Sequence, residues 1–359
     1  MDESIKDWRS YDFGGIEEFR TFNEQGYIYK ITSLGKECFK NFSNLETLSL
    51  SYNNLSKIES NSFQHLNKLK KLNLNRNEIN KIDQNGFRGL ENLEELYISE
   101  NKLAKIESNS FQYLNKLKYL YLEKNEINEI DQDGFRGLEN LEILDLEENK
   151  LVKLEYETFQ HLKNLKFLFL NKNQITSVDL NEFQFFENLE QLTLEKNKLT
   201  QIQTDSFQHL KKLKALNLNY NEIASIHFNG FRGLENLEDL ELWSNQLTRV
   251  DANEFQYLKK LKFLNVGSNQ FGKMESIEIQ DLRNLVKLDL RHNKLVKIES
   301  SLFRNFKDLK ILALEDNRLN EIDPDGFQDL VNLEEIRLEG NLLEENNSML
   351  EIMIKLKKT

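Results

Sequence analysis

The chain has 359 residues, of which 39% are hydrophobic and 30% are charged, with a single proline and a single cysteine. Its formal net charge of −12, without any block of Lys or Arg, argues against nucleic acid and anionic membrane surfaces as partners. Cys38 has no second cysteine with which to form an internal disulfide or a thiolate-rich zinc site, so packing must hold the fold together.

The first thirty residues carry scattered charges and lack an apolar run of the length that a secretory signal requires. Elsewhere apolar runs stop at about four residues, whereas a spanning helix needs roughly twenty. We therefore expect no signal peptide and no membrane insertion. Three sequons, at Asn41, Asn54 and Asn346, would accept glycan if the chain were secreted.

Residues 1–44 are predicted to form an N-terminal cap and half of the repeat that fills most of the chain, because residues 31–44 fit the second half of that repeat. The preceding half has lost its leucines. Its apolar residues are expected to cover the open edge of the first full repeat, as the terminal units of stacked repeats must. These residues are Ile5, Trp8, Ile16, Phe19 and Phe22.

Residues 45–332 are twelve insertion-free copies of a 24-residue pattern, L-x-x-L-x-L-x-x-N-x-L-x-x-I-x-x-x-x-F-x-x-L-x-x, which begin at Leu45 and continue to Leu309. The period-two alternation predicts one short strand per copy, with Leu48 and Leu50 pointing inward and the third, fifth and seventh positions pointing outward. One copy cannot bury its own apolar edge, so successive copies must stack and share a continuous core.

Two positions of the pattern are expected to be structural. An Asn occupies the ninth position of every copy, and its amide can satisfy backbone groups in its own turn and in the adjacent one. A Phe at the nineteenth position of nearly every copy makes the return segments bulkier than the strands. The stack should therefore curve, with the strands on its concave side.

This pattern resembles the leucine-rich-repeat family in its 24-residue typical form, familiar from animal extracellular receptors and matrix proteins. The resemblance implies an α/β-type repeat solenoid, a curved horseshoe with a parallel β-sheet on the concave face and irregular or short helical convex segments. It also implies an extracellular or cell-surface location. Those relatives usually end in disulfide-bonded caps, which this chain lacks, and a genuine start without a signal would instead indicate the cytoplasm.

A second period, of 48 residues, runs through the repeats. Copies with F-Q-[HY]-L alternate with copies of the form F-R-G-L, and the residue after the leading Leu alternates between Glu and Lys from Glu46 to Lys262. Two explanations stay open. The alternating charges oppose mispairing, because skipping one repeat would set like charges side by side, or they are a relic of duplication.

Residues 333–359 are predicted to form a partial repeat and a C-terminal capping helix. A capping box at Ser348 opens this helix, and Met349, Ile352, Met353 and Leu356 would share one of its faces. We expect that face to seal the last repeat. The alternative is that it binds a partner helix or a membrane.

No local motif brings a nucleophile to a base or pairs two carboxylates, so we expect no enzymatic activity, no cofactor and no metal site. His65, His161 and His209 share a repeat position but stand two or more copies apart, too far to ligate one ion. The fifteenth position is acidic in ten of twelve copies, from Glu59 to Asp323. Ca²⁺ is a less favoured reading of that row, because Lys or Arg two positions earlier compensates most of these charges.

The third to sixth copies carry apolar side chains at outward strand positions, where most copies carry small, polar or charged ones. Four adjacent strands span about 15 Å, so we predict one contiguous ligand-binding patch: Tyr97, Tyr119, Tyr121, Ile143, Asp145, Phe167 and Phe169. An acidic rim would favour a partner with a basic border: Glu95, Glu123, Glu147, Glu148 and Glu195. The alternative is that aromatic residues stand there because they suit β-strands.

Trp243 and Phe263 form a smaller, secondary candidate site for a ligand. The sequence as a whole predicts a non-enzymatic scaffold that binds a protein or peptide across its concave face, with no nucleic-acid partner. Two alternatives remain. One is a structural or matrix protein that self-associates, for example as a homodimer, and the other is an ectodomain-like fragment of a larger receptor.

Overall fold

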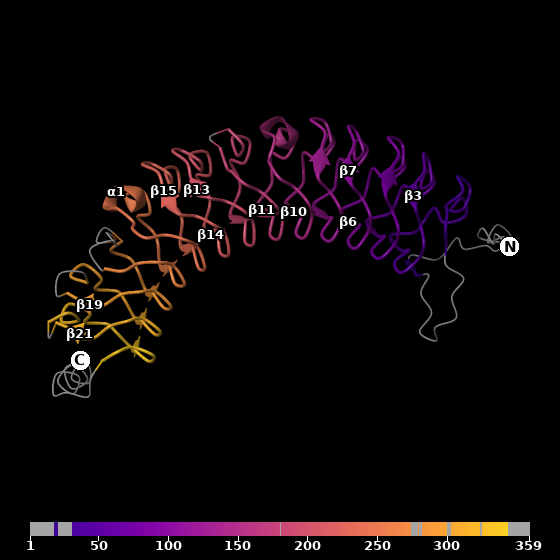
Figure 1. Cartoon of the computed structure of the whole chain (residues 1–359). Helices are drawn as coiled ribbons and strands as arrows, with labels where there is room; N and C mark the ends of the chain where they lie inside the picture. Colours follow the sequence, from indigo (N-terminus) through magenta and orange to yellow (C-terminus); the bar gives the residue numbers. More distant parts are fainter. Residues whose placement is uncertain are drawn as a thin grey trace. The chain divides into compact units, whose positions relative to one another are not determined.

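The structure is a computed structural model that describes residues 18–20, 31–179, 181–273, 279, 282–299, 303–323 and 325–343. The chain divides into two compact units, one of Met1–Gln174 with Gln184–Leu189 and the other of Ile175–Phe183 with Glu190–Thr359 (Figure 1). The predicted C-terminal helix lies outside the described residues, as do four of the five residues predicted to cover the first repeat. The fifth, Phe19, lies in strand β1 (Glu18–Arg20).

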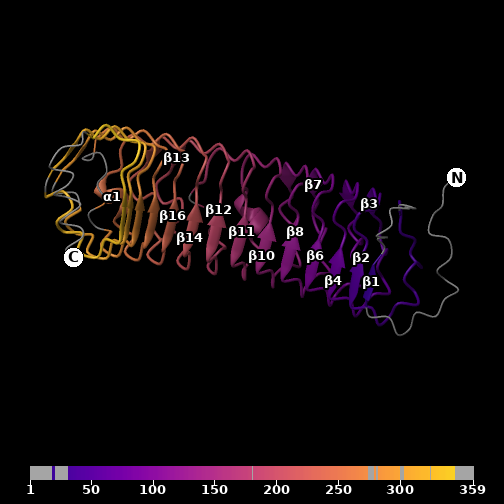
Figure 2. The same cartoon turned by 90° about the horizontal axis from the view of Figure 1, so that it is seen from below.

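We call each 24-residue copy a coil and number the coils from one, at Leu45, to twelve, at Leu309. In the first unit each coil adds one strand to a parallel sheet, and neighbouring strands pair in register, so that Leu96 pairs with Leu120. Figure 2 shows these strands side by side. They are β1, β2 (Thr47–Ser49), β4 (Lys71–Asn73), β6 (Glu95–Tyr97), β8 (Tyr119–Tyr121), β10 (Ile143–Asp145) and β11 (Phe167–Phe169).

The second unit repeats this arrangement with a parallel sheet of its own coils. Its strands pair with the same 24-residue offset, so that Leu216 pairs with Leu240. They are β12 (Gln191–Thr193), β14 (Ala215–Asn217), β16 (Asp239–Glu241), β17 (Phe263–Asn265), β18 (Lys287–Asp289), β20 (Ile311–Ala313) and β22 (Glu335–Arg337). The predicted parallel-strand repeat solenoid is confirmed.

From β2 to β20, each three-residue strand buries its central residue and leaves the two flanking side chains on the outer side of the sheet. Leu120 and Leu144, for example, are fully buried between half-buried neighbours. We call this outer side of the sheet the strand face of each unit. The described helical segments are short, η2 (Tyr156–Phe159) and α1 (Ala252–Phe255). No helix among the described residues is both long enough and apolar enough to cross a membrane.

The ninth-position Asn joins adjacent coils through its side-chain amide. Nδ2 of Asn125 donates to the carbonyl of Leu122 in its own coil at 2.9 Å and to that of Ile98 in the preceding coil at 3.0 Å. Its Oδ1 accepts from the N–H of Leu103 at 3.1 Å. The same bonds recur in both units, for example at Asn101 in the first and Asn245 in the second. The prediction that this row is a buried structural ladder is confirmed.

The nineteenth-position Phe rings stack on the side of the core away from the sheet. Ring centroids of Phe63 and Phe87 lie 6.2 Å apart, and those of Phe207 and Phe231 in the second unit also lie 6.2 Å apart, each pair with an interplanar angle of 9°. All four rings are fully buried. This column of offset rings supplies much of the apolar area that each coil removes from water.

On the side opposite the sheet, short strands pair in twos, and the pairs follow the 48-residue period. In the first unit β3 (Lys57–Ile58) pairs with β5 (Lys81–Ile82) and β7 (Lys105–Ile106) with β9 (Glu129–Ile130). In the second, β13 (Gln201–Ile202) pairs with β15 (Ser225–Ile226) and β19 (Lys297–Ile298) with β21 (Glu321–Ile322). Figure 1 shows several of these strands on the side away from the sheet.

Glycines of the F-R-G-L coils allow close packing in three of these four pairs of coils. Gly137 has φ +93°, and a Cβ there would approach the backbone of Gln112, in the preceding coil, to 2.8 Å. Gly89 and Gly233 have the same conformation, and each lies similarly close to the equivalent Gln of its preceding coil, Gln64 and Gln208. Only glycine lets the second coil of these three pairs lie this close to the first. In the fourth pair, β19 with β21, Asp329 stands at this position.

The alternating Glu and Lys after each leading Leu also interact inside these pairs. Lys118 Nζ lies 2.7 Å from Glu94 Oε2, and Lys262 Nζ in the second unit lies 2.7 Å from Glu238 Oε2. Within the alternating run from Glu46 to Lys262, these contacts join each Lys to the Glu of the preceding coil. The function of the alternation in opposing mispairing stays a prediction.

Candidate functional site

The seven residues of the predicted patch lie together on the strand face of the first unit. Ile143 pairs with Tyr119 on one side and Phe167 on the other, which forms a row of third-position side chains. The fifth-position row runs beside it, where Asp145 pairs with Tyr121 and Phe169. We call this group the strand-face patch: Tyr97, Tyr119, Tyr121, Ile143, Asp145, Phe167 and Phe169. All seven are half-buried, because each packs against its cross-strand neighbours.

One end of the patch is fixed by an aromatic stack and a charged network. The rings of Tyr97 and Tyr121 lie nearly parallel, with centroids 4.8 Å apart. The hydroxyl of Tyr97 donates to Glu95 at 2.7 Å, Lys71 Nζ lies 2.9 Å from the same carboxylate, and Lys71 also stands 4.9 Å from the centre of the Tyr97 ring. Burial alone would raise the pKa of Glu95, but hydrogen bonds from Lys71 and Tyr97 lower it. These contacts hold the ring of Tyr97 in place.

Asp145 lies in the middle of the patch, between Tyr121 and Phe169 in the fifth-position row. Its Oδ1 accepts the backbone N–H of Glu147 at 2.9 Å. Burial raises the pKa of Asp145 to about 6, that single hydrogen bond opposes the rise, and the nearby charges of Glu123 and Glu147 add to it. The carboxylate therefore sits in a site that disfavours its own negative charge.

Glu123 adds a second carboxylate beside Asp145. Its Oε2 is buried and makes no hydrogen bond within the described part of the chain. Glu147, by contrast, is paired with Lys172 at 2.8 Å. Among the described residues, neither Asp145 nor Glu123 has an ion pair like that of Glu147. A cation that reached Asp145 and Glu123 would therefore meet two carboxylates without a cationic partner, next to aromatic rings. This combination suits a Lys or Arg side chain.

The glutamates predicted to form an acidic rim around the patch do not form one group in the structure. Glu95 belongs to the network with Tyr97, Glu147 and Glu148 share Lys172, and Glu195 belongs to the second unit. Sequence reasoning missed Lys71. The signal was present, since Lys71 occupies the third position of coil two, in the strand that pairs with the strand of Glu95. It also missed the desolvation of Asp145, which depends on how closely the neighbouring rings pack.

The secondary candidate, Trp243 and Phe263, is less compact. Phe263 pairs with Asp239 at one end of its strand, and 41% of its surface is exposed. Trp243 follows the other end of the preceding strand, where its ring covers Gly267, lies edge-on to His292 at 5.4 Å and stands 5.3 Å from the Arg291 guanidinium. The two aromatic residues therefore occupy different ends of the strand face in the second unit.

The other polar groups singled out in the sequence have ordinary partners. His161 Nε2 lies 3.2 Å from Asp133, and the fifteenth-position Asp131 pairs with Lys105 at 2.7 Å. Among the described residues no three His, Cys, Asp or Glu side chains converge as ligands for a metal ion. Cys38 is half-buried, and its Sγ accepts the N–H of Gly35 at 3.1 Å.

The repeat geometry agrees with a comparison of the sequence with protein families. A profile described as Leucine rich repeat matches residues 29–79, 67–127, 119–175, 140–199, 168–223, 187–247, 218–271 and 283–343. The chain belongs to the leucine-rich-repeat family. A search of curated proteins gave no match.

Solved structures of other leucine-rich-repeat proteins share this fold. A chain of the Drosophila Toll–Spatzle complex has a TM-score of 0.79 and 24% identity, over 90% of this chain and 43% of that one. A leucine-rich-repeat protein of Leptospira interrogans has a TM-score of 0.73 and 23% identity, over 91% and 92%. The TLR13–ssRNA13 complex gives 0.66 and 23%, over 90% and 57%. This leucine-rich-repeat chain thus spans less than half of the matched Toll–Spatzle chain, and at these identities the likeness concerns the fold.

Proposed function

We propose that the chain is a non-enzymatic scaffold that binds a protein or peptide through the strand-face patch of its first unit. The observation that carries this proposal is Asp145, a desolvated carboxylate between Tyr121 and Phe169 with the unpaired Oε2 of Glu123 nearby. A buried polar group without a partner costs free energy in the folded chain. A ligand that supplies the missing partner recovers that cost on binding.

The partner that fits this site presents a Lys or Arg side chain within an apolar or aromatic surrounding. The cationic group would pair with Asp145 and Glu123, while its stem and its neighbours cover the rings of Tyr121 and Phe169. Aromatic residues and desolvated charge pairs contribute most of the affinity at typical interfaces. The rest of the strand face would contribute shape complementarity but little of the binding affinity.

Two of the solved structures with a similar fold are complexes with different classes of ligand, a Toll–Spatzle complex and a TLR13–ssRNA13 complex. For this chain the carboxylates of the patch favour a protein or peptide over RNA, because phosphate would be repelled by Asp145, Glu123 and Glu147. Self-association is the competing function. It predicts a concentration-dependent dimer in light scattering that Phe169→Glu dissociates.

A random dodecapeptide library displayed on phage tests the proposal. We expect selected peptides to be enriched in Lys or Arg next to aromatic or aliphatic residues, and to lose binding to Phe169→Glu. Ser49→Glu is the matched control, because Ser49 occupies the same strand position in the first coil, outside the patch. Peptides that bind Phe169→Glu as well as the unmodified chain would place the binding surface elsewhere. Circular dichroism verifies that both variants are folded.

A further inference from the structure

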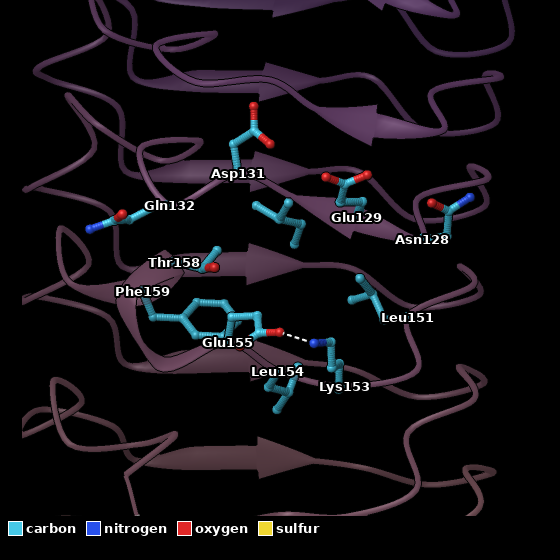
Figure 3. Close-up of a pocket in the computed structure, with 11 residues that line it drawn as sticks. Asn128, Glu129, Asp131, Gln132, Leu151, Lys153, Leu154, Glu155, Thr158 and Phe159 are labelled. Atoms are coloured by element: carbon cyan, nitrogen blue, oxygen red, sulfur yellow. Dashed lines mark ion pairs between the residues drawn. The ribbon is translucent and has the colours of Figure 1, made fainter.

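The side of the first unit opposite the sheet has an opening between coil four (residues 117–140) and coil five (residues 141–164). It is a cavity of about 400 Å³, a volume typical of ligand sites. Figure 3 shows its lining from both coils, with Asn128, Glu129 and Asp131 on one side and Leu151, Lys153, Leu154 and Glu155 on the other. Ile130, Thr158 and Phe159 also line it. We call this cavity the back cleft.

The back cleft lies at an interrupted hydrogen-bond ladder. Within the preceding pair of coils, the N–H of Asn128 donates to the carbonyl of Ala104 at 3.0 Å and the N–H of Asp131 to that of Ile106 at 2.9 Å. The corresponding bonds between coils four and five would run from Val152 to Asn128 and from Glu155 to Ile130. Neither bond is present in this described region. The coil-four side of the opening therefore offers two backbone carbonyls, and coil five offers the N–H of Glu155 in the lining and the N–H of Val152 between the lining residues Leu151 and Lys153.

The same ladder is interrupted between coils two and three, but that junction is closed by side chains. Ile82 is 3% exposed there and Ile106 is 1% exposed. At the back cleft the equivalent residue, Ile130, is half-buried, although Leu154 opposite it is buried. The back cleft thus exposes both an apolar side chain and a strand edge, whereas the other junction hides its isoleucines.

The local sequence of coil five explains why this junction is open. Coils one and three carry Asn61 and Asn109 at the seventeenth position, both in the left-handed conformation with φ of 64° and 63°. Asn tolerates that conformation better than most residues. Coil five carries Glu157 there, and its segment forms the short helix η2 instead. Leu154 also replaces the β-branched Ile that occupies this position in coils one to four.

We propose that the back cleft binds an extended peptide segment of a partner protein, with alternating apolar and basic side chains. The backbone of such a segment donates to the carbonyls of Asn128 and Ile130 and accepts from the N–H groups of Val152 and Glu155, which completes the ladder by strand addition. Its inward side chains would contact Ile130, Leu154 and Phe159 on the apolar floor. This site is independent of the strand-face patch.

The charges around the cleft select the basic side chains of the segment. The lining carries three carboxylates, Glu129, Asp131 and Glu155, against a single Lys153. Lys153 is already paired with Glu155 (Figure 3), and Lys105 reaches Glu129 and Asp131 from coil three, with Nζ 2.7 Å from each carboxylate. An acidic peptide would meet repulsion at this rim, and a basic one attraction.

A fluorescein-labelled heptapeptide of alternating lysine and valine, followed by fluorescence anisotropy at low ionic strength, tests this proposal on the full chain. We expect saturable binding that Ile130→Arg weakens about tenfold, which corresponds to about 1.4 kcal/mol. Val296→Arg adds the same charge at the equivalent position of coil eleven, an exposed side chain outside the cavity lining, and should change the affinity less than about twofold. Phe169→Glu should have no effect, which separates this site from the strand-face patch.

Two further measurements distinguish strand addition from nonspecific attraction. A heptapeptide N-methylated on its backbone should bind about tenfold more weakly, because it lacks the donors that the ladder requires. In the unmodified chain, the peptide should slow hydrogen exchange at the amides of Val152 and Glu155. The proposal is overturned if Ile130→Arg binds like the unmodified chain, if the N-methylated peptide binds equally well, or if those two amides gain no protection.

Discussion

The strand faces of the two units stand on the same scaffold but carry different chemistry. In the first unit, β8 and β11 present aromatic residues on both sides of their buried leucines. In the second, the corresponding positions of β14, β16 and β18 hold Ala215 and Asn217, Asp239 and Glu241, and Lys287 and Asp289. The buried positions are interchangeable between units, and the outward ones are not. Stability therefore depends on the repeat, and we propose that recognition depends on the few coils in which the outward residues change.

The largest expected effect tests whether the scaffold is equivalent in both units. Asn173→Leu removes donors from the carbonyls of Leu146 and Leu170 and leaves the N–H of Leu151 without its acceptor. Because buried unsatisfied groups cost about 1–3 kcal/mol each, we expect a loss of about 3 kcal/mol or more in urea unfolding. Asn245→Leu in the second unit should cost a similar amount. A loss in one unit alone would show that the two ladders are not equivalent.

A smaller effect comes from the desolvated carboxylates, one on each strand face. Burial raises the pKa of both Asp145 and Asp239 to about 6. The unfolded chain releases these protons near pH 4. Each of these carboxyl groups is thus a weaker acid in the folded state, so its contribution to the stability of the protein falls as pH rises from about 4 to about 6 and stays lower above that range.

Asp145→Asn and Asp239→Asn should each remove this penalty. We expect both variants to be more stable than the unmodified chain at pH 7.5 by about 1–2 kcal/mol, a discounted value because the side chains keep some exposure. That advantage should vanish near pH 4. Urea unfolding at the two pH values measures it. A difference that does not depend on pH would contradict the assignment of the raised pKa to these carboxyl groups.

Binding measurements should distinguish Asp145 from Asp239, although the two carboxylates are expected to have similar effects on stability. If the strand-face patch takes a cationic side chain, Asp145→Asn loses affinity for library-selected peptides and Asp239→Asn does not. The affinity of the unmodified chain should also fall as pH drops through about 6, where Asp145 takes up a proton. The reverse pattern would move recognition to the second unit, where Asp239 pairs with Phe263.

The sequence alone predicts most of the scaffold, because the period of the pattern dictates which side chains are buried. The strand positions, the Asn ladder and the adjacency of Tyr121, Asp145 and Phe169 follow from the 24-residue spacing and the alternation within each strand. What could not be predicted depends on close packing between coils. The pKa of Asp145 and the opening beside Ile130 are set by neighbours that no motif specifies. The glycine of the F-R-G-L coils was visible, but its contact with Gln112 was not.

The smallest expected effect concerns the alternating Glu and Lys residues after the leading Leu of successive coils. We call this row the charge ladder, and both units share it. Lys118 and Lys166 pair with Glu94 and Glu142 at 2.7 and 2.8 Å, yet more than two fifths of each lysine side chain is exposed to solvent. Lys118→Glu combined with Lys166→Glu should therefore lower stability only slightly, and salt should erase the difference.

Refolding decides what the charge ladder does. If the alternation opposes mispairing, the doubly substituted chain refolds in lower yield at low salt, because correct and skipped pairings then both set like charges side by side and charge no longer favours the correct one. Lys214→Glu with Lys262→Glu makes the same test in the second unit, where these lysines pair with Glu190 and Glu238 at 2.6 and 2.7 Å. Equal yields for all three proteins would leave the alternation as a relic of duplicated pairs of coils. In that case the Asn ladder, which needs no charge, is sufficient to keep the coils in register.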